Sequence, residues 1–208
     1  MINPNIYSAV RALLENDCSG HDWFHTVRVV NMAKRIAACE DADMELTELA
    51  ALLHDVDDVK LFGKNSRNAV RIMQKYGCTE DVQKSVMEII HSISFRGNGA
   101  SVPKSLEGKI VQDADRLDAI GAVGIARAFA YGGNKGRIMH DPSMMPRDGM
   151  SETEYRNGNG TTLNHFYEKL LRLKELMNTQ TAKAIAQERH DVMVAFLEEF
   201  YAEWDGER

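Results

Sequence analysis

Histidine is directly followed by aspartate four times in this chain, and one of these pairs follows a long apolar run. The pair His54-Asp55 comes directly after the run 49–53. Imidazole and carboxylate groups are ligands of divalent metals, and they cost free energy at the edge of a core unless a partner compensates them. Together with His25 upstream and Asp115 downstream, the pair predicts a four-ligand metal site of a hydrolytic kind.

Two of the other pairs have simpler interpretations, and His140-Asp141 lies in the glycine-rich segment 132–162. His190-Asp191 lies in a polar patch of an amphipathic C-terminal segment, which is typical of a solvated helix face. Asp22 follows Ser19, Gly20 and His21 and precedes a helical pattern, so it is predicted to be an N-cap. Only His54-Asp55 is preceded by an apolar run that would hold it rigidly.

Apolar residues recur at helical spacing along most of the chain. The four prolines fall outside these runs, as helices require, and no stretch alternates long enough to predict a strand. We therefore expect an all-α protein, a single globular helical bundle. The runs predict helices near residues 27–37, 46–53, 70–73, 82–93, 106–118, 119–131, 163–177 and 181–201.

Bulk properties narrow the class of protein. A chain of 208 residues with 44% hydrophobic residues suits one domain with a sizeable core, and its net charge of −6 argues against a general nucleic-acid binder. Three widely spaced cysteines without a CxxC pattern suit a reducing compartment. With no signal-peptide pattern and no apolar run of ~18 residues, we expect a cytoplasmic protein without a membrane partner. The oligomeric state stays open.

One long segment breaks the helical pattern. Residues 132–162 contain six glycines and two prolines, which predicts a loop of an unusual length for a compact domain. The segment carries several basic residues and could form a basic lid, or it could be a surface loop without a role. The expected organisation is one domain over 1–208, with a metal-site core at about 20–131, this loop, and C-terminal helices at about 163–204.

The predicted helix 106–118 contains three carboxylates in a stretch of six residues, at Asp113, Asp115 and Asp118. Asp115 and Asp118 share a helix face at i,i+3, whereas Asp113 points elsewhere. Three acids in an otherwise apolar stretch are costly without a cation. A metal ion would neutralise them, and a salt-bridge network with Arg116 and Arg28 is the alternative.

The order His25, His54-Asp55, Asp115 resembles the HD-domain superfamily of metal-dependent phosphohydrolases. Longer segments are similar to its bacterial nucleotide pyrophosphohydrolases of the YpgQ/YedJ type, and the resemblance runs from about residue 19 to 204. These segments are GHDWFHTVRV, ALLHDVDD, QDADRLDAIGAVGIARAFAYGG, EYRNG and LNHFYEKL. The resemblance implies an HD-type helical bundle with one divalent metal on His25, His54, Asp55 and Asp115. It also implies hydrolysis of nucleoside triphosphates to monophosphate and pyrophosphate, with Mn²⁺ favoured over Mg²⁺, Ni²⁺, Co²⁺ or Fe²⁺.

The residue types suit that chemistry. A divalent ion activates water and polarises a phosphoryl oxygen, and a carboxylate beside it can act as base. We therefore assign catalytic roles to Asp55, His91 and Asp118, although His91 could instead be a structural histidine. A nucleotide substrate needs cationic partners. The candidates, each of which could also be a solvated surface cation, are Arg28, Lys60, Arg67 and Lys169.

Three other functions compete with this interpretation. A nucleotide phosphomonoesterase would use the same metal and release orthophosphate. A di-iron oxygenase would need further histidine ligands, of which only His91 is well placed. A non-catalytic nucleotide sensor is the third, but no second domain accompanies the four predicted ligands.

Overall fold

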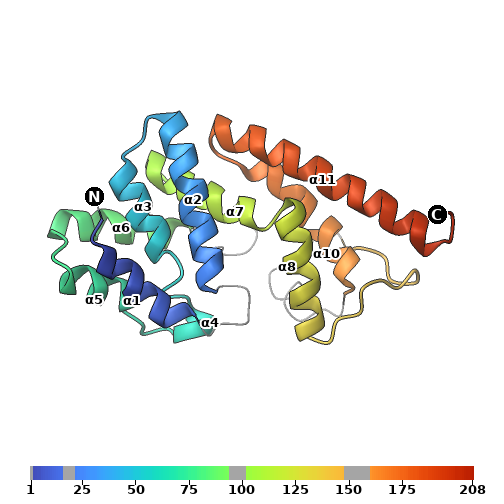
Figure 1. Ribbon diagram of the computed structural model, residues 1–208, viewed down its shortest axis with the longest axis horizontal. Helices are drawn as coiled ribbons and strands as arrows, with labels where there is room; N and C mark the ends of the chain where they lie inside the picture. Colours follow the sequence, from blue (N-terminus) through green and yellow to red (C-terminus); the bar gives the residue numbers. More distant parts are fainter. Residues whose placement is uncertain (1, 16–21, 94–101, 148–159) are drawn as a thin grey trace. The chain divides into compact units, whose positions relative to one another are not determined.

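The computed structural model describes residues 2–15, 22–93, 102–147 and 160–208, and within these ranges it contains helices and no strand (Figure 1). The predicted all-α class is confirmed. The chain forms two compact units, residues 1–115 and 116–208, which are described separately below. The expectation of one domain over 1–208 stays a prediction. None of the described helices is both long and apolar enough to span a membrane.

The first unit is built around α3, Met44–Leu53, which packs against α1, α2 and α6. Apolar side chains cover α3 on all sides near its C-terminal end, because neighbouring helices surround it there. Asp43 caps its N-terminus by accepting a hydrogen bond from the Leu46 amide at 3.0 Å. The other helices of this unit are α1 Pro4–Leu14, α2 Trp23–Glu40, α4 Val59–Phe62, α5 Asn68–Lys75, α6 Glu80–Ile93 and most of α7 Leu106–Asp118.

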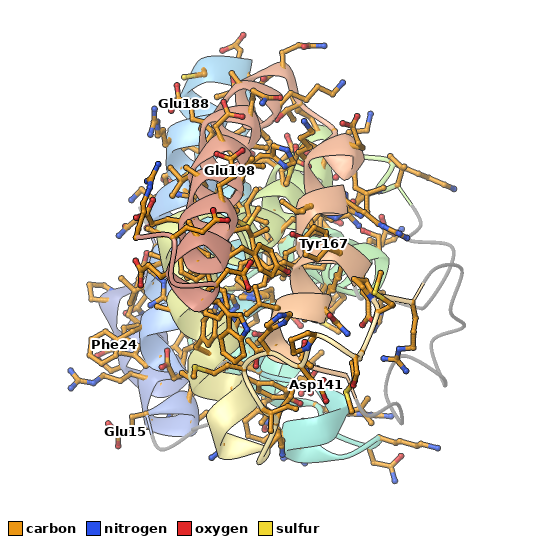
Figure 2. All side chains as sticks on the ribbon, turned by 90° about the vertical axis from the view of Figure 1, so that its right-hand side faces the viewer. Glu15, Phe24, Asp141, Tyr167, Glu188 and Glu198 are labelled. Atoms are coloured by element: carbon orange, nitrogen blue, oxygen red, sulfur yellow. The ribbon has the colours of Figure 1, made fainter. Side chains whose placement is uncertain are left out.

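The second unit contains α8 Gly121–Asn134, α10 Thr162–Glu168, the 3-10 helix η1 Leu170–Leu176 and the long helix α11 Gln180–Trp204. α11 packs along α8 and η1, while Glu188 and Glu198 on it are exposed (Figure 2). Phe129, Phe166 and Phe196 bring three helices together, with ring centroids 5.8 to 6.1 Å apart. This aromatic cluster forms the core of the unit.

Most predicted helices are present, but three differences have physical reasons. The predicted helix 163–177 is broken at Lys169, whose backbone (φ −141, ψ −57) leaves the helical region, and it continues as η1. α1 was not predicted, although Pro4 at its first turn and the Asn3 cap are start signals. α4 has only four residues, too few for a periodic pattern.

The predicted loop 132–162 begins later than expected and ends where it was expected. α8 extends to Asn134 and α10 begins at Thr162. Two hydrogen bonds of 3.0 Å join the chain after α8 to α10, in which Thr162 N donates to Ile138 O and Leu163 N donates to Met139 O. Residues 148–159, which include the whole segment EYRNG with Arg156, lie outside the described part. Residues 94–101 lie outside it as well.

The end of α8 approaches α10 so closely that a side chain would not fit. A Cβ at Gly132 would lie 2.4 Å from Thr162 Oγ1, whereas a Cβ at the neighbouring Gly133 would meet nothing within 4 Å. Contacts of this kind force a backbone or side-chain shift. Gly132 is therefore required by the packing and Gly133 is not.

We expect Gly132→Ala to lower the free energy of unfolding by about 1–3 kcal/mol because the new methyl overlaps the Thr162 hydroxyl. Gly133→Ala is the matched control and should be neutral, or stabilising by up to ~1 kcal/mol, because alanine favours helix. Urea denaturation followed by circular dichroism measures both. The double variant Gly132→Ala, Thr162→Ala should regain part of the loss. Equal stability of the two single alanine variants would contradict the packing argument.

Candidate metal centre

His25 is positioned by the start of α2. The Asp22 side chain accepts a hydrogen bond from the His25 amide at 2.6 Å, so the predicted N-cap is confirmed. Adjacent helix residues point in different directions. Phe24 is therefore 66% exposed at the edge of the molecule (Figure 2), while the His25 side chain is only 1% exposed.

His54 is positioned by the end of α3. It is the C-cap residue, and its Nδ1 lies 2.8 Å from the carbonyl oxygen of Ala51. A carbonyl only accepts hydrogen bonds, so Nδ1 carries a proton and donates it. In the neutral ring the lone pair is then on Nε2, which is the atom that faces His25. This is how a backbone carbonyl orients a metal-ligating histidine.

Four side chains from three helical regions converge at one point of the first unit. His25 Nε2 lies 3.3 Å from His54 Nε2, 3.4 Å from Asp55 Oδ2 and 3.5 Å from Asp115 Oδ1. His54 Nε2 also lies 3.2 Å from Asp55 Oδ2. Ligand atoms of His25, His54 and Asp115 all lie within 4.8 Å of one another. The structure thus brings together the four residues that the sequence predicted as ligands.

The spacing, chemistry and charge of this cluster fit a divalent ion. Two ligands at roughly 2.1 Å from one ion, at right or tetrahedral angles, are about 3.0–3.5 Å apart, which is the spacing found here. Burial alone would lower the pKa of His54, but the carboxylates of Asp55 and Asp115 outweigh it and raise that pKa to about 9. The cluster therefore favours a positive charge at its centre.

The cluster is open on the side of Asp115. The Asp115 side chain is 44% exposed, whereas those of Asp55, His54 and His25 are 13%, 3% and 1% exposed. Asp113, also on α7, is fully buried. Of the three aspartates on α7, Asp115 is therefore the one with access to both the histidines and solvent.

The remaining predicted residues of the first unit lie on separate elements. Arg28 is half-buried on α2, one turn after His25, and His91 is exposed on α6. Arg67 is exposed at the start of α5. Lys60 lies in α4, and its side chain is outside the described part of the chain. Their predicted roles toward a substrate stay predictions.

Asp118 and Lys169 belong to the second unit. Asp118 is nearly buried, and its Oδ2 accepts a hydrogen bond from Arg127 Nη1 at 2.7 Å, so this carboxylate is held by an ion pair. Lys169 is half-buried at the end of α10. The catalytic role of Asp118 and the substrate-binding role of Lys169 stay predictions.

Lys169 lies near a second cation, Arg137, and a largely buried histidine, His165, a grouping that was not predicted from the sequence. Burial and the nearby cations Lys169 and Arg137 lower the pKa of His165 to about 3. Glu168, the acid next to Lys169 in the chain, is paired with Arg147, with Oε1 and Nε 3.1 Å apart. The spacing of His165 and Lys169 at i,i+4 was a signal for this grouping, but the approach of Arg137 depends on the contact between the chain after α8 and the start of α10.

Comparisons with known proteins agree with this geometry. The HD-domain family profile matches residues 23–120, which include all four converging residues. Bacillus subtilis YpgQ is 42% identical over 193 residues, covering 90% of this chain and 86% of YpgQ. Its structure in complex with ADP superposes with a TM-score of 0.77, at 37% identity over 96% of this chain and 93% of that one.

Two further solved structures are similar over almost their whole length. A Lactobacillus plantarum protein has a TM-score of 0.82 and 42% identity, covering 99% of this chain and 100% of that chain. An HD-superfamily hydrolase from Bacillus thuringiensis has a TM-score of 0.75 and 43% identity, covering 97% and 96%.

The low pKa of His165 predicts how stability depends on pH. Unfolded histidine has a pKa near 6.5, so below that pH the unfolded chain binds a proton that the folded chain does not, until about pH 3. Stability should therefore fall on acidification through this window. Between pH 7 and 5 we expect the wild type to lose about 1–2 kcal/mol more than a His165→Gln variant.

Urea denaturation at several pH values measures this difference. NMR provides a direct check, because the His165 ring signals should stay constant from pH 8 to 5. A His165 signal that titrates near pH 6.5 would contradict the burial and the positive field inferred here.

Proposed function

Because the chain belongs to the HD-domain superfamily, we propose that it is a metal-dependent hydrolase that cleaves nucleoside triphosphates to monophosphate and pyrophosphate. The observation that carries the proposal is the convergence of two imidazoles and two carboxylates at 3.2 to 3.5 Å. The similarity to an HD-superfamily hydrolase supports a hydrolytic reaction. The complex of YpgQ with ADP supports a nucleotide substrate that contains a phosphoanhydride.

We assign the metal to His25, His54, Asp55 and Asp115, with Mn²⁺ as the preferred ion. When bound, a divalent ion supplies Lewis acidity toward a phosphoryl oxygen and activates water. Asp55 has a second role in this proposal. Its carboxylate lies within the cluster yet remains partly exposed, so it can accept the proton of the attacking water.

Charge balance requires cations beyond the cluster. A divalent ion with the carboxylates of Asp55 and Asp115 sums to zero, so the cluster alone does not attract a triphosphate. Basic side chains must supply that attraction, and such charge-assisted contacts are strong. We assign this task to Arg28, Lys60 and Lys169, with Arg67 as a further candidate, and place His91 and Asp118 in supporting roles to the reaction.

Product analysis tests the proposed reaction. The protein should be incubated with Mn²⁺ and each ribo- and deoxyribonucleoside triphosphate, and the products separated by ion-exchange chromatography. We expect monophosphate and pyrophosphate in equal amounts. In ¹⁸O-labelled water the label should enter the monophosphate, because attack at the α-phosphorus breaks its bond to the oxygen that leaves with pyrophosphate.

Two controls and one contrary outcome define this experiment. Chelation should abolish turnover, and added Mn²⁺ should restore it. Turnover measured with Mg²⁺, Ni²⁺, Co²⁺ or Fe²⁺ in place of Mn²⁺ ranks the metals. Asp115→Ala should lose metal and turnover without unfolding, because Asp115 is 44% exposed. Orthophosphate released from monophosphates, with triphosphates untouched, would overturn the proposal in favour of a phosphomonoesterase.

Lys169→Ala tests the assignment of the substrate cations. Loss of one charge-assisted contact costs about 1.5–3 kcal/mol, so the Michaelis constant for the triphosphate should rise about 10- to 100-fold while Mn²⁺ affinity is unchanged. Lys183→Ala, an exposed lysine on α11, is the matched control and should have no effect. Steady-state kinetics and Mn²⁺ titration measure both. An unchanged specificity constant in Lys169→Ala and Lys60→Ala would show that these lysines do not bind phosphate.

A further inference from the structure

The backbone that carries His54 and Asp55 leaves α3 and enters a tight turn. Val56 N donates to Leu53 O at 3.4 Å, and Asp58 N donates to Asp55 O at 3.0 Å. These local bonds define the turn, and α3 leads into it. A second support is needed if the Asp55 carboxylate is to keep its place beside the two histidines.

Asp57 provides that support by capping a helix from a distance. Its carboxylate accepts hydrogen bonds from Asn68 N at 2.7 Å, from Ala69 N at 3.1 Å and from the Ser66 hydroxyl. Asn68 N and Ala69 N are the first two amides of α5. The N-cap residue of this helix, Arg67, makes no side-chain capping hydrogen bond. The open N-terminus of α5 is thus satisfied by a residue two positions after the predicted ligand Asp55.

Asn68 ties the same two segments in the opposite direction. Its Nδ2 donates to the carbonyl oxygen of Val56 at 2.8 Å, directly after Asp55. Val56 and Ala69 are both fully buried, so the connection lies against the core. α5 in turn packs on α6 and α1. Reciprocal bonds therefore join the turn to a helix that is itself held in the unit.

We propose that Asp57 and Asn68 are positioning residues of the metal centre, which hold the His54-Asp55 turn against α5 so that the ligands keep their spacing. The inference rests on the metal site of the proposed function. Metal–ligand distances tolerate only about 0.2 Å of variation, so a turn that moves freely on one side would weaken binding. Mutation of a residue that orients a ligand typically lowers metal affinity 10- to 100-fold.

Asn68→Ala is the sharpest variant. It removes the bond to Val56 O but keeps the backbone amide that Asp57 caps, so α5 should stay intact. Asp57→Ala removes all bonds to the carboxylate, and Ser66→Ala removes one of them while leaving the tie to Val56. Mn²⁺ titration of the metal-free protein by electron paramagnetic resonance should give a dissociation constant about 10-fold higher for Asn68→Ala. The increase should be larger for Asp57→Ala and smaller for Ser66→Ala.

Thr179→Ala is the matched control for stability. Thr179 caps α11 in the second unit by accepting from Ala182 N at 3.2 Å, so its loss also removes a helix cap. It should lower the unfolding free energy by an amount similar to Asn68→Ala and leave Mn²⁺ affinity unchanged. A merely structural role of Asp57 and Asn68 would give the same pattern as Thr179→Ala.

Amide hydrogen exchange of the metal-free protein provides a readout that needs neither metal nor substrate. The amides of Val56 and Asp58 should exchange faster in Asn68→Ala and Asp57→Ala than in wild type and in Thr179→Ala. If the wild type bound no Mn²⁺, the proposed function would fail and exchange alone would decide whether the turn depends on α5. Wild-type Mn²⁺ affinity and wild-type exchange in a folded Asn68→Ala variant would overturn the inference, even if Asp57→Ala failed to fold.

Discussion

The structure of the first unit depends on one electrostatic constraint, which is the crowding of two carboxylates and two imidazoles in a largely buried space. Carboxylates removed from water are costly unless positive charge compensates them. The raised pKa of His54 is the response of the metal-free cluster to that constraint. Because a divalent ion meets the same requirement more fully, the cap of α2, the end of α3 and the turn after it can all be understood as supports for one site.

Neutralising the cluster has a consequence for the rest of the molecule. In the proposed function, an ion that balances Asp55 and Asp115 leaves no surplus charge to hold an anionic substrate, so the attraction must come from other side chains. The second unit contains two candidate cations, Lys169 and Arg137, which together with burial lower the pKa of His165. Asp118 does not add negative charge of its own there, because Arg127 pairs with it. Metal binding and substrate binding thus make separate demands on charge.

The sequence predicted the features that depend on neighbours in the chain. Helical periodicity located α2, α3, α6, α7 and α11, and Asp22 was recognised as a cap because the residue and the amide it accepts from are three positions apart. The four residues that converge were predictable for a related reason, since two of them are adjacent and the others lie in distinct motifs. The break at Lys169 was not predictable, because it depends on a backbone conformation that apolar spacing does not encode.

Features that depend on distant residues escaped prediction. In the sequence, Asp57 is simply another acid after the pair His54-Asp55. The backbone amides that donate to it are 11 and 12 residues further on, and this spacing belongs to no local motif. The need for glycine at position 132 arises in the same way, from the approach of Thr162. A sequence therefore shows which groups can bind a metal more readily than it shows what holds them still. In this protein the two kinds of residue are interleaved, so the acids at 55 and 57 look alike in the sequence although one faces the histidines and the other faces α5.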